Sequence, residues 1–315
     1  MLQFLRLFVV LIVGLSALCG LGAVSADEGA NEPIAGIGPV GPIEKLHGDF
    51  KFVEGPAADR EGNVYFSDIP ASLIYRVDIQ DKLSVFRTES NSSNGLMFNA
   101  QGELVACEMG GRVTAISEDG KTARPLAEQF EGKRFNAPND LVVDKSGGVY
   151  FTDPHFRAPM PLPQGVMGVY YISAEGEVTR LIDDLKAPNG VILSPDEQTL
   201  YVIPTLQAEM MAYPVEKQGK IGKGKVFCTL KQPPKETGKG GDGLTVDTQG
   251  NLYITSALGL QVFDAKGAAL GIIAFPEQPA NVTFGGPERK KLYVTARTGL
   301  YVAPMEAVGH VFEGK

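Results

Sequence analysis

The fold is decided by the stretch from residue 136 to residue 154, which reads NAPNDLVVDKSGGVYFTDP. It contains an amide–carboxylate pair, Asn139-Asp140, then the apolar run Leu141–Val143, a turn that ends in two glycines, and a second apolar run, Val149–Thr152. Two short runs rich in Val, Tyr and Phe around a glycine turn are typical of neighbouring antiparallel strands. The stretch therefore predicts a strand, a tight turn and a second strand.

The same pattern occurs six times along the chain. Each copy begins with an oxygen-bearing residue, and these residues are Glu54, Asn94, Asn139, Asn189, Asp242 and Asn281. Successive copies are separated by 40, 45, 50, 53 and 39 residues. Propeller blades of four strands are about 40–50 residues long. We therefore expect an all-β fold, a six-bladed β-propeller with four antiparallel strands in each blade.

The last copy has a third apolar run at residues 299–302 but no clear fourth. Residues 42–46, PIEKL, have the character of a fourth run and precede the first copy. We expect this N-terminal strand to complete the last blade and close the ring, because closure removes exposed sheet edges. Whether residues 303–315 add to the same blade is left open. The propeller domain is thus expected over residues 43–315, after a Gly- and Pro-rich linker at 27–42.

Residues 1–26 are interpreted as a signal peptide. Arg6 supplies the positive charge, residues 7–18 form an apolar core too short to span a bilayer comfortably, and Val24-Ser25-Ala26 is a small-residue cleavage site. Lipidation at Cys19 is disfavoured by the large residue before it. The mature chain is expected to be exported, periplasmic or secreted, without a membrane anchor, and its oligomeric state is left open.

Composition excludes two classes of function. The formal net charge is −8 and there is no basic stripe, which argues against nucleic acid as a partner. Cys107 and Cys228 remain after residue 26, and two buried thiols are favoured over a disulfide. Neither cysteine has a histidine at metal-ligand spacing, so a zinc site built on them is disfavoured.

The six leading residues are expected to form a ring, because the first strand of each propeller blade lines the central channel. Turn chemistry would explain one or two such residues, since Asn and Asp often begin turns. It does not explain an oxygen donor in every copy, including a Glu. Carboxylates and amide oxygens without Cys or His suit a hard cation, Ca²⁺ above all, with Mg²⁺, Mn²⁺ or Zn²⁺ as alternatives.

Several motifs resemble those of the regucalcin/gluconolactonase family of six-bladed propellers, over residues 45–303. They are Glu54-Gly55-Pro56, Pro138-Asn139-Asp140, Tyr150-Phe151-Thr152-Asp153-Pro154, Pro188-Asn189-Gly190 and Gly241-Asp242-Gly243. The resemblance implies one divalent cation held by Glu54, Asn139, Asn189 and Asp242. It also implies hydrolysis of a small-molecule lactone or related ester, with Asp242 as the catalytic general base.

The chemistry that such a site would perform is consistent with this resemblance. A cation in the channel polarises a lactone carbonyl and stabilises the oxyanion, while Asp242 activates the attacking water. Opening a sugar lactone in this way gives an aldonic acid. Two alternatives stay open: hydrolysis of other esters or phosphotriesters on the same ring, and a binding propeller whose cation is only structural.

Further residues are expected near the site with less defined roles. The candidates for substrate contact are Asn94, Glu108, Arg134, Asp153 and Asn281. Asp140 is expected either to orient Asn139 or to bind a second metal ion. His155 is interpreted as a surface or hydrogen-bonding residue, and residues 156–167 as a loop that is either a lid over the channel mouth or a plain surface loop. The direction of Arg297 is left open.

Overall fold

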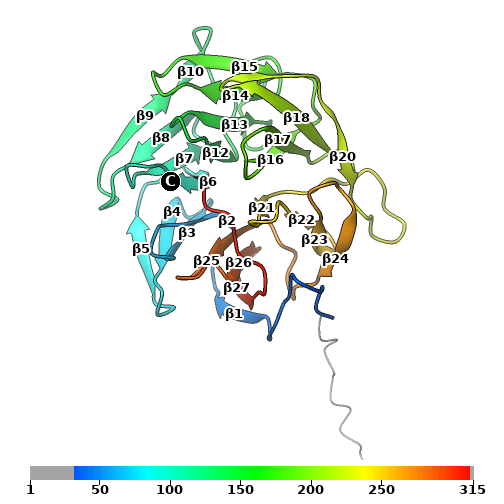
Figure 1. Cartoon of the computed structure of the whole chain (residues 1–315). Coiled ribbons are helices and arrows are strands. Elements are labelled where there is room, and N and C mark those ends of the chain that lie inside the picture. Colours follow the sequence, from blue (N-terminus) through cyan, green and yellow to red (C-terminus); the bar gives the residue numbers. More distant parts are fainter. Residues whose placement is uncertain (1–31, 313–315) are drawn as a thin grey trace, which may run out of the picture. The chain divides into compact units, whose positions relative to one another are not determined.

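The computed structural model describes residues 32–312, and every regular element in this range is a β-strand. The strands form six main antiparallel sheets around a central channel (Figure 1), so the predicted six-bladed β-propeller is confirmed. Within the described range, no helix is long and apolar enough to cross a membrane. The predicted signal peptide and the first residues of the predicted linker lie outside the described residues.

The blades follow one another along the chain, each built from the channel outward. Blade one contains β2 (Val53–Ala58), β3 (Val64–Asp68), β4 (Leu73–Val77) and β5 (Leu83–Arg87). Blade two contains β6 (Ser93–Phe98), β7 (Leu104–Glu108), β8 (Arg112–Ile116) and β9 (Ala123–Ala127). Blade three contains β12 (Leu141–Val143), β13 (Val149–Asp153), β14 (Gly168–Ile172) and β15 (Val178–Ile182). A short hairpin of β10 (Gln129–Phe130) and β11 (Lys133–Arg134) separates blades two and three.

The remaining blades complete the circle. Blade four contains β16 (Pro188–Leu193), β17 (Thr199–Pro204), β18 (Glu209–Lys217) and β20 (Lys225–Thr229). Blade five contains β21 (Leu244–Val246), β22 (Leu252–Ser256), β23 (Gly259–Phe263) and β24 (Ala269–Ile273). Blade six contains β25 (Asn281–Gly285), β26 (Lys291–Ala296), β27 (Gly299–Pro304) and β1 (Glu44–His47). In blade four the short β19 (Lys220–Ile221) pairs with the end of β18.

The predicted ring closure is confirmed, because β1 pairs antiparallel with β27 in the last blade. Glu44 lies opposite Val302, and Lys45 lies opposite Tyr301. Residues just before β1 also contact this blade: Ile37 is buried in its core, and Val40 N donates a hydrogen bond to the Pro304 carbonyl. Part of the predicted linker is therefore packed against blade six.

The stretch that decides the fold behaves as a strand, a turn and a strand. Leu141 lies opposite Phe151 and Val143 opposite Val149, and all side chains of β12 and β13 are buried. Burial on both faces is expected for a blade that packs between two neighbours. Both cysteines are also buried and neither is disulfide-bonded, as predicted.

A carboxylate holds the turn between these two strands. Asp144 Oδ1 accepts hydrogen bonds from Ser146 N (2.8 Å) and Gly148 N (2.9 Å). Gly147 takes a φ of 84°, which glycine adopts without steric cost. Side chains at the same place in the other blades accept equivalent bonds from their turns, and these are Asp59, Asn99, Ser194 and Asp247. These residues explain why Asp and Asn recur at the far ends of the innermost strands.

The chain after β27 crosses the far end of the channel (Figure 1, red). Gly309 N donates to the Arg289 carbonyl of blade six, and His310 N donates to the Val246 carbonyl of blade five. Phe312 is only 3% exposed and belongs to the largest hydrophobic cluster. Residues 305–312 therefore add no strand to blade six but cover one end of the channel.

Candidate active site at the channel mouth

A glycine after the leading residue lets neighbouring blades approach closely. The amide of Gly95 donates to the Asn139 carbonyl (2.8 Å), and the amide of Gly190 donates to the Asp242 carbonyl (2.9 Å). A Cβ on Gly95 would lie 2.8 Å from the Asn139 carbonyl oxygen, and one on Gly190 would lie 2.5 Å from that of Asp242. Gly95 and Gly190 are thus required to bring successive leading residues side by side.

The same contacts define which residues occupy equivalent positions. The amide of Gly243 donates to the Ala280 carbonyl (2.9 Å), just as Gly95 and Gly190 donate to Asn139 and Asp242. In blade six the equivalent of Asn139 is therefore Ala280, and Asn281 lies one residue further along. The expected six-membered ring of oxygen donors thus has five members at this level.

These five leading residues line one cavity at the channel mouth, with a volume of about 320 Å³. They are Glu54, Asn94, Asn139, Asn189 and Asp242. Asn189 Nδ2 donates to Asp242 Oδ1 (2.6 Å) and to Thr205 Oγ1 (2.9 Å), and Glu54 Oε2 accepts from Gly55 N (2.8 Å). The four residues implied as ligands by the resemblance are therefore gathered in one place, together with Asn94.

Burial shifts the pKa values of both carboxylates at the channel mouth. Burial, and then the charge of Asp242, raises the pKa of Glu54 well above its ordinary value. Burial raises the pKa of Asp242 to about 6, although a hydrogen bond from Asn189 and the charge of Arg297 act to lower it. Within residues 32–312, neither carboxylate forms an ion pair. A bound cation would supply the missing charge.

Asp140 and Asn281 lie at a second level of the channel. Both line a small cavity of about 50 Å³, which His310 and Phe312 also line. Asp140 Oδ1 accepts from Leu141 N (2.9 Å), while burial raises the pKa of the Asp140 carboxyl to about 7. A hydrogen bond from Asn281 lowers the pKa values of Glu54 and Asp140, so Asn281 connects the two levels.

Arg134 does not line the cavity. Its guanidinium donates to the backbone carbonyls of Phe135 (3.0 Å), Gly110 (2.9 Å) and Asn136 (3.3 Å). These bonds tie the end of the hairpin of β10 and β11 to the β7–β8 turn. The geometry therefore gives Arg134 a structural role in place of the expected substrate contact.

Glu108 is also occupied away from the cavity. It is 1% exposed and accepts hydrogen bonds from Arg112 Nε (2.6 Å), Asn91 Nδ2 (2.7 Å) and Thr114 Oγ1 (2.9 Å). These contacts use both carboxylate oxygens. Glu108 thus stabilises the top of blade two, and no oxygen is directed to a substrate.

Asp153 supports the segment that precedes Asn139. Its two oxygens accept hydrogen bonds from Asn136 N and Ala137 N, both at 2.8 Å, and the side chain is fully buried. Burial raises the pKa of Asp153 to about 7. His155, two residues on, is exposed and lies 3.2 Å from Met167 Sδ through Nδ1, in keeping with its interpretation as a surface residue.

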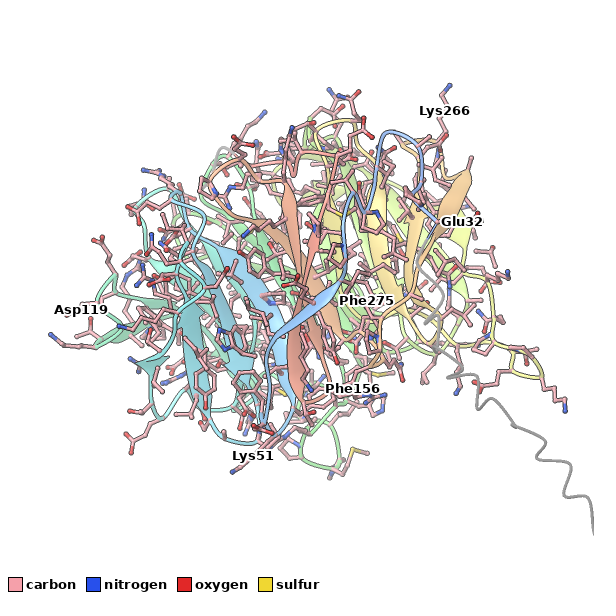
Figure 2. All side chains as sticks on the ribbon, turned by 90° about the horizontal axis from the view of Figure 1, so that it is seen from below. Glu32, Lys51, Asp119, Phe156, Lys266 and Phe275 are labelled. Atoms are coloured by element: carbon pink, nitrogen blue, oxygen red, sulfur yellow. The ribbon has the colours of Figure 1, made fainter. Side chains whose placement is uncertain are left out.

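Several cavity residues were not predicted from the sequence. They are Phe52, Ile69, Pro70, Met109, Phe156, Arg157 and Thr205. Phe156 lies at the end of the propeller opposite Lys266 (Figure 2). Most of these residues follow the end of the second strand of a blade, and that shared position is the signal that could have identified them. Phe156 and Arg157 also show that the loop after Asp153 reaches the channel mouth. Arg297, whose direction was open, lies over the Phe52 ring at 5.7 Å.

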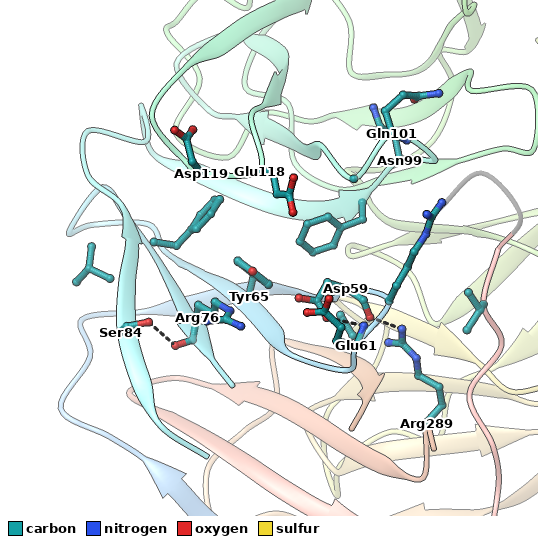
Figure 3. Close-up of a pocket in the computed structure, with 17 residues that line it drawn as sticks. Asp59, Glu61, Tyr65, Arg76, Ser84, Asn99, Gln101, Glu118, Asp119 and Arg289 are labelled. Carbon is teal, nitrogen blue, oxygen red and sulfur yellow. Dashed lines mark hydrogen bonds between the residues drawn. The ribbon is translucent and has the colours of Figure 1, made fainter. Parts of the chain in front are cut away.

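A larger cavity of about 730 Å³ lies at the opposite ends of the strands, between blades one and two (Figure 3). Its polar groups hold turns: Asp59 accepts from Glu61 N and Asn63 N, and Arg289 donates to the Asp59 carbonyl. Similar but smaller hollows lie between later blades at the same end. The larger cavity lies between blades, so it results from the way that propeller blades pack. The channel mouth is therefore the better candidate site.

The donor set at the channel mouth fits a hard divalent cation. It offers two carboxylates and three amides from separate blades, and the side-chain amides of Asn94 and Asn139 have no hydrogen-bond partner within residues 32–312. In the same range no three His, Cys, Asp or Glu side chains form a metal-binding group, so the amides are needed as ligands. Oxygen-only coordination of this kind is typical of Ca²⁺.

Fold and site together define a six-bladed propeller whose channel mouth gathers carboxylate and amide oxygens for a cation. The chain belongs to the SMP-30/gluconolactonase/LRE-like family, whose model matches residues 52–298. It is 29% identical to a gluconolactonase of Zymomonas mobilis over 81% of this chain and 79% of that protein. It is 29% identical to lactonase drp35 of Staphylococcus haemolyticus over 71% and 70%.

A solved structure supports the same assignment. The structure of a gluconolactonase from Xanthomonas campestris has a TM-score of 0.76 and 31% sequence identity, covering 84% of this chain and 89% of that one. Sequence similarity therefore supports the family, and structural similarity supports the fold.

Proposed function

We propose that this protein is a hydrolase that opens lactones at a divalent cation held by Glu54, Asn139, Asn189 and Asp242. The observation that carries the proposal is the gathering of these four side chains at the mouth of a channel closed at its other end. The relatives named gluconolactonase and lactonase support the same reaction. Calcium is the cation that the oxygen ligands suit best.

The bound cation would polarise the lactone carbonyl and stabilise the negative charge that develops on its oxygen. Asp242 is proposed as the general base: it takes a proton from water while the water oxygen attacks the carbonyl carbon. The ring C–O bond then breaks, and the ring oxygen takes the proton that Asp242 removed from the water, giving a hydroxy acid. A sugar lactone would give an aldonic acid.

Two contacts in the structure suit Asp242 to this role. The hydrogen bond from Asn189 Nδ2 to Oδ1 (2.6 Å) fixes the orientation of the carboxylate. The charge of Arg297 and this hydrogen bond oppose the effect of burial on the pKa of Asp242, and so favour the ionised form that a base requires.

The proposal is tested with a panel of lactones, aryl esters and phosphotriesters. We expect turnover of lactones, and a loss of at least about 100-fold in kcat for Asp242→Asn. Asp264→Asn is the matched control, because this aspartate belongs to the same blade but holds an exposed outer turn. Turnover of phosphotriesters without lactones, or full activity of Asp242→Asn, would contradict the proposal.

We also propose, from the sequence of residues 1–26 alone, that the protein is exported. The test is N-terminal sequencing of the protein recovered from the cell exterior or periplasm of the native host. The proposal predicts a mature chain that begins at Asp27. Recovery of the uncleaved chain in the cytoplasm would overturn it.

A further inference from the structure

One wall of the channel-mouth cavity is apolar. Phe52, Ile69, Pro70, Met109 and Phe156 line it. Ile69 and Met109 are 5% and 6% exposed and belong to one small hydrophobic cluster, against which Phe52 and Phe156 pack. These side chains come from blades one, two and three, which are neighbours. The wall is therefore continuous over half of the ring.

Three carboxylates that precede the wall residues in the sequence do not line the cavity. Asp68, Glu108 and Asp153 end β3, β7 and β13; Ile69 and Met109 directly follow the first two, and Phe156 comes three residues after Asp153. Asp68 accepts from the amides of Lys51 and Phe52, while Glu108 and Asp153 make the bonds described above. Asp68 and Asp153 hold backbone amides and Glu108 holds three side chains, while the wall residues that follow them present an apolar surface.

Two polar side chains besides the five leading residues line the cavity, Thr205 and Arg157. The Thr205 hydroxyl accepts a hydrogen bond from Asn189 Nδ2 and donates one to the Gly241 carbonyl, so it already acts as both acceptor and donor. Arg157 is exposed, with a φ of 60°, and lies in the loop at the cavity's edge. Beyond the five leading residues and Arg157 at the cavity's edge, the described lining is therefore apolar or, at Thr205, already hydrogen-bonded.

We infer that the substrate body beyond the ester group is apolar, so that the cavity suits an alkyl- or aryl-substituted lactone better than a polyhydroxylated one. This inference rests on the proposed function and names the substrate class of the same site. A substrate hydroxyl buried against the wall loses its hydrogen bonds to water without gaining one to the protein. Each such hydroxyl lowers the binding affinity about tenfold. The volume of about 320 Å³ suits one ring with a short substituent.

The direct test compares two six-membered lactones, δ-nonalactone and glucono-δ-lactone, with the cation-loaded protein. We expect kcat/KM for δ-nonalactone to be at least about tenfold higher, after correction for spontaneous hydrolysis. Equal or faster turnover of glucono-δ-lactone would overturn the inference and leave the proposed function standing. Hydrolysis of neither lactone would contradict the proposed function itself, and the inference with it.

Variants locate the preference in the wall. Met109→Gln keeps the side-chain length but adds an amide, and is expected to lower the ratio of the two kcat/KM values by about tenfold. Met160→Gln is the matched control, because Met160 is 78% exposed and outside the cavity, and it should leave the ratio unchanged. Phe156→Tyr adds a hydroxyl at a partly buried position and serves if Met109→Gln does not fold. An unchanged ratio in every folded wall variant would overturn the inference.

Binding gives a readout that does not depend on catalysis. The δ-lactam analogues of the two substrates are titrated calorimetrically into the metal-free protein. The alkyl lactam is expected to bind more tightly, with a negative heat-capacity change that marks burial of apolar surface. Tighter binding of the polyhydroxylated lactam would contradict an apolar substrate body.

Discussion

Asn189 donates a hydrogen bond of 2.6 Å to Asp242 across the boundary between blades four and five. The same amide donates to Thr205 Oγ1, whose hydroxyl donates to the Gly241 carbonyl. Two of the proposed ligands are therefore positioned by one another and by a threonine that lines the cavity. This arrangement links the geometry of the site to the packing of two blades.

Thr205→Val should weaken cation binding. Valine has the shape of threonine but cannot accept the bond from Asn189, so the amide loses one of its two fixed partners. Loss of such a supporting contact typically lowers metal affinity about 10- to 100-fold. Calcium titration calorimetry measures the change, with Thr179→Val on the exposed part of β15 as the control. Unchanged affinity would show that Thr205 does not position the ligand.

Glu54→Gln should have opposite effects without and with a cation. In the metal-free protein the variant is expected to be more stable wherever Glu54 is ionised, because burial and the charge of Asp242 disfavour the ionised form and raise the pKa of Glu54. Saturating Ca²⁺ should stabilise the original chain by about 3 kcal/mol at 100 times Kd, and the variant much less. Thermal unfolding with and without Ca²⁺ measures both effects. An equal Ca²⁺-induced shift in Tm would remove Glu54 from the ligand set.

Gly95→Ala should destabilise the fold through steric contact. The added Cβ would lie 2.7 Å from the Asp140 Cα and 2.8 Å from the Asn139 carbonyl oxygen, both in the next blade. We expect a loss of about 3 kcal/mol in the free energy of unfolding. Gly102→Ala is the control: its φ of 79° brings strain of about 1 kcal/mol, but its Cβ meets no atom within 4 Å. Equal losses measured by urea unfolding would refute close blade approach at Gly95.

Asp153 should make stability fall as the pH rises. Burial raises its pKa to about 7 in the folded chain, above the ordinary value of about 4. The folded state thus binds the proton more tightly, and this contribution is complete below about pH 4 and lost as the pH rises through 7. Relative to Asp153→Asn, the original chain should lose up to about 1.4 kcal/mol per pH unit in that window. Urea unfolding at several pH values measures the difference.

A second aspartate gives the opposite sign and serves as the control. Hydrogen bonds from Ala268 N and Lys266 N lower the pKa of Asp264. Its contribution is therefore present above the ordinary pKa and lost on acidification below it. Asp264→Asn should leave the slope between pH 5 and 7 unchanged. A flat difference for Asp153→Asn over the same window would contradict a raised pKa.

The sequence predicted the propeller because its repeats carry local chemistry. The turn carboxylate Asp144 and the apolar runs beside it recur in recognisable form, and the missing fourth run of the last copy predicts closure by β1. The channel position of Glu54, Asn139, Asn189 and Asp242 follows from the same repeat, because the first strand of every blade faces the axis.

Two features of the site depend on contacts made only in the folded chain and were not predicted. Asn281 begins the sixth copy in the sequence. The hydrogen bond from Gly243 N to the Ala280 carbonyl shows, however, that Ala280 occupies the ring position and that Asn281 lies one residue further along. Glu108 and Arg134 have the polarity expected of substrate contacts, but neighbouring backbone and side-chain groups already use their hydrogen bonds.

The central claim is lactone hydrolysis that depends on the cation at the channel mouth. The most direct measurement is the rate of lactone hydrolysis by protein stripped of metal, before and after Ca²⁺, Mg²⁺, Mn²⁺ or Zn²⁺ is added back singly. The account predicts a loss of at least about 100-fold on stripping. It also predicts recovery when one equivalent of cation, best Ca²⁺, is restored. Undiminished hydrolysis by the stripped protein, or no hydrolysis with any of the four cations, would contradict it.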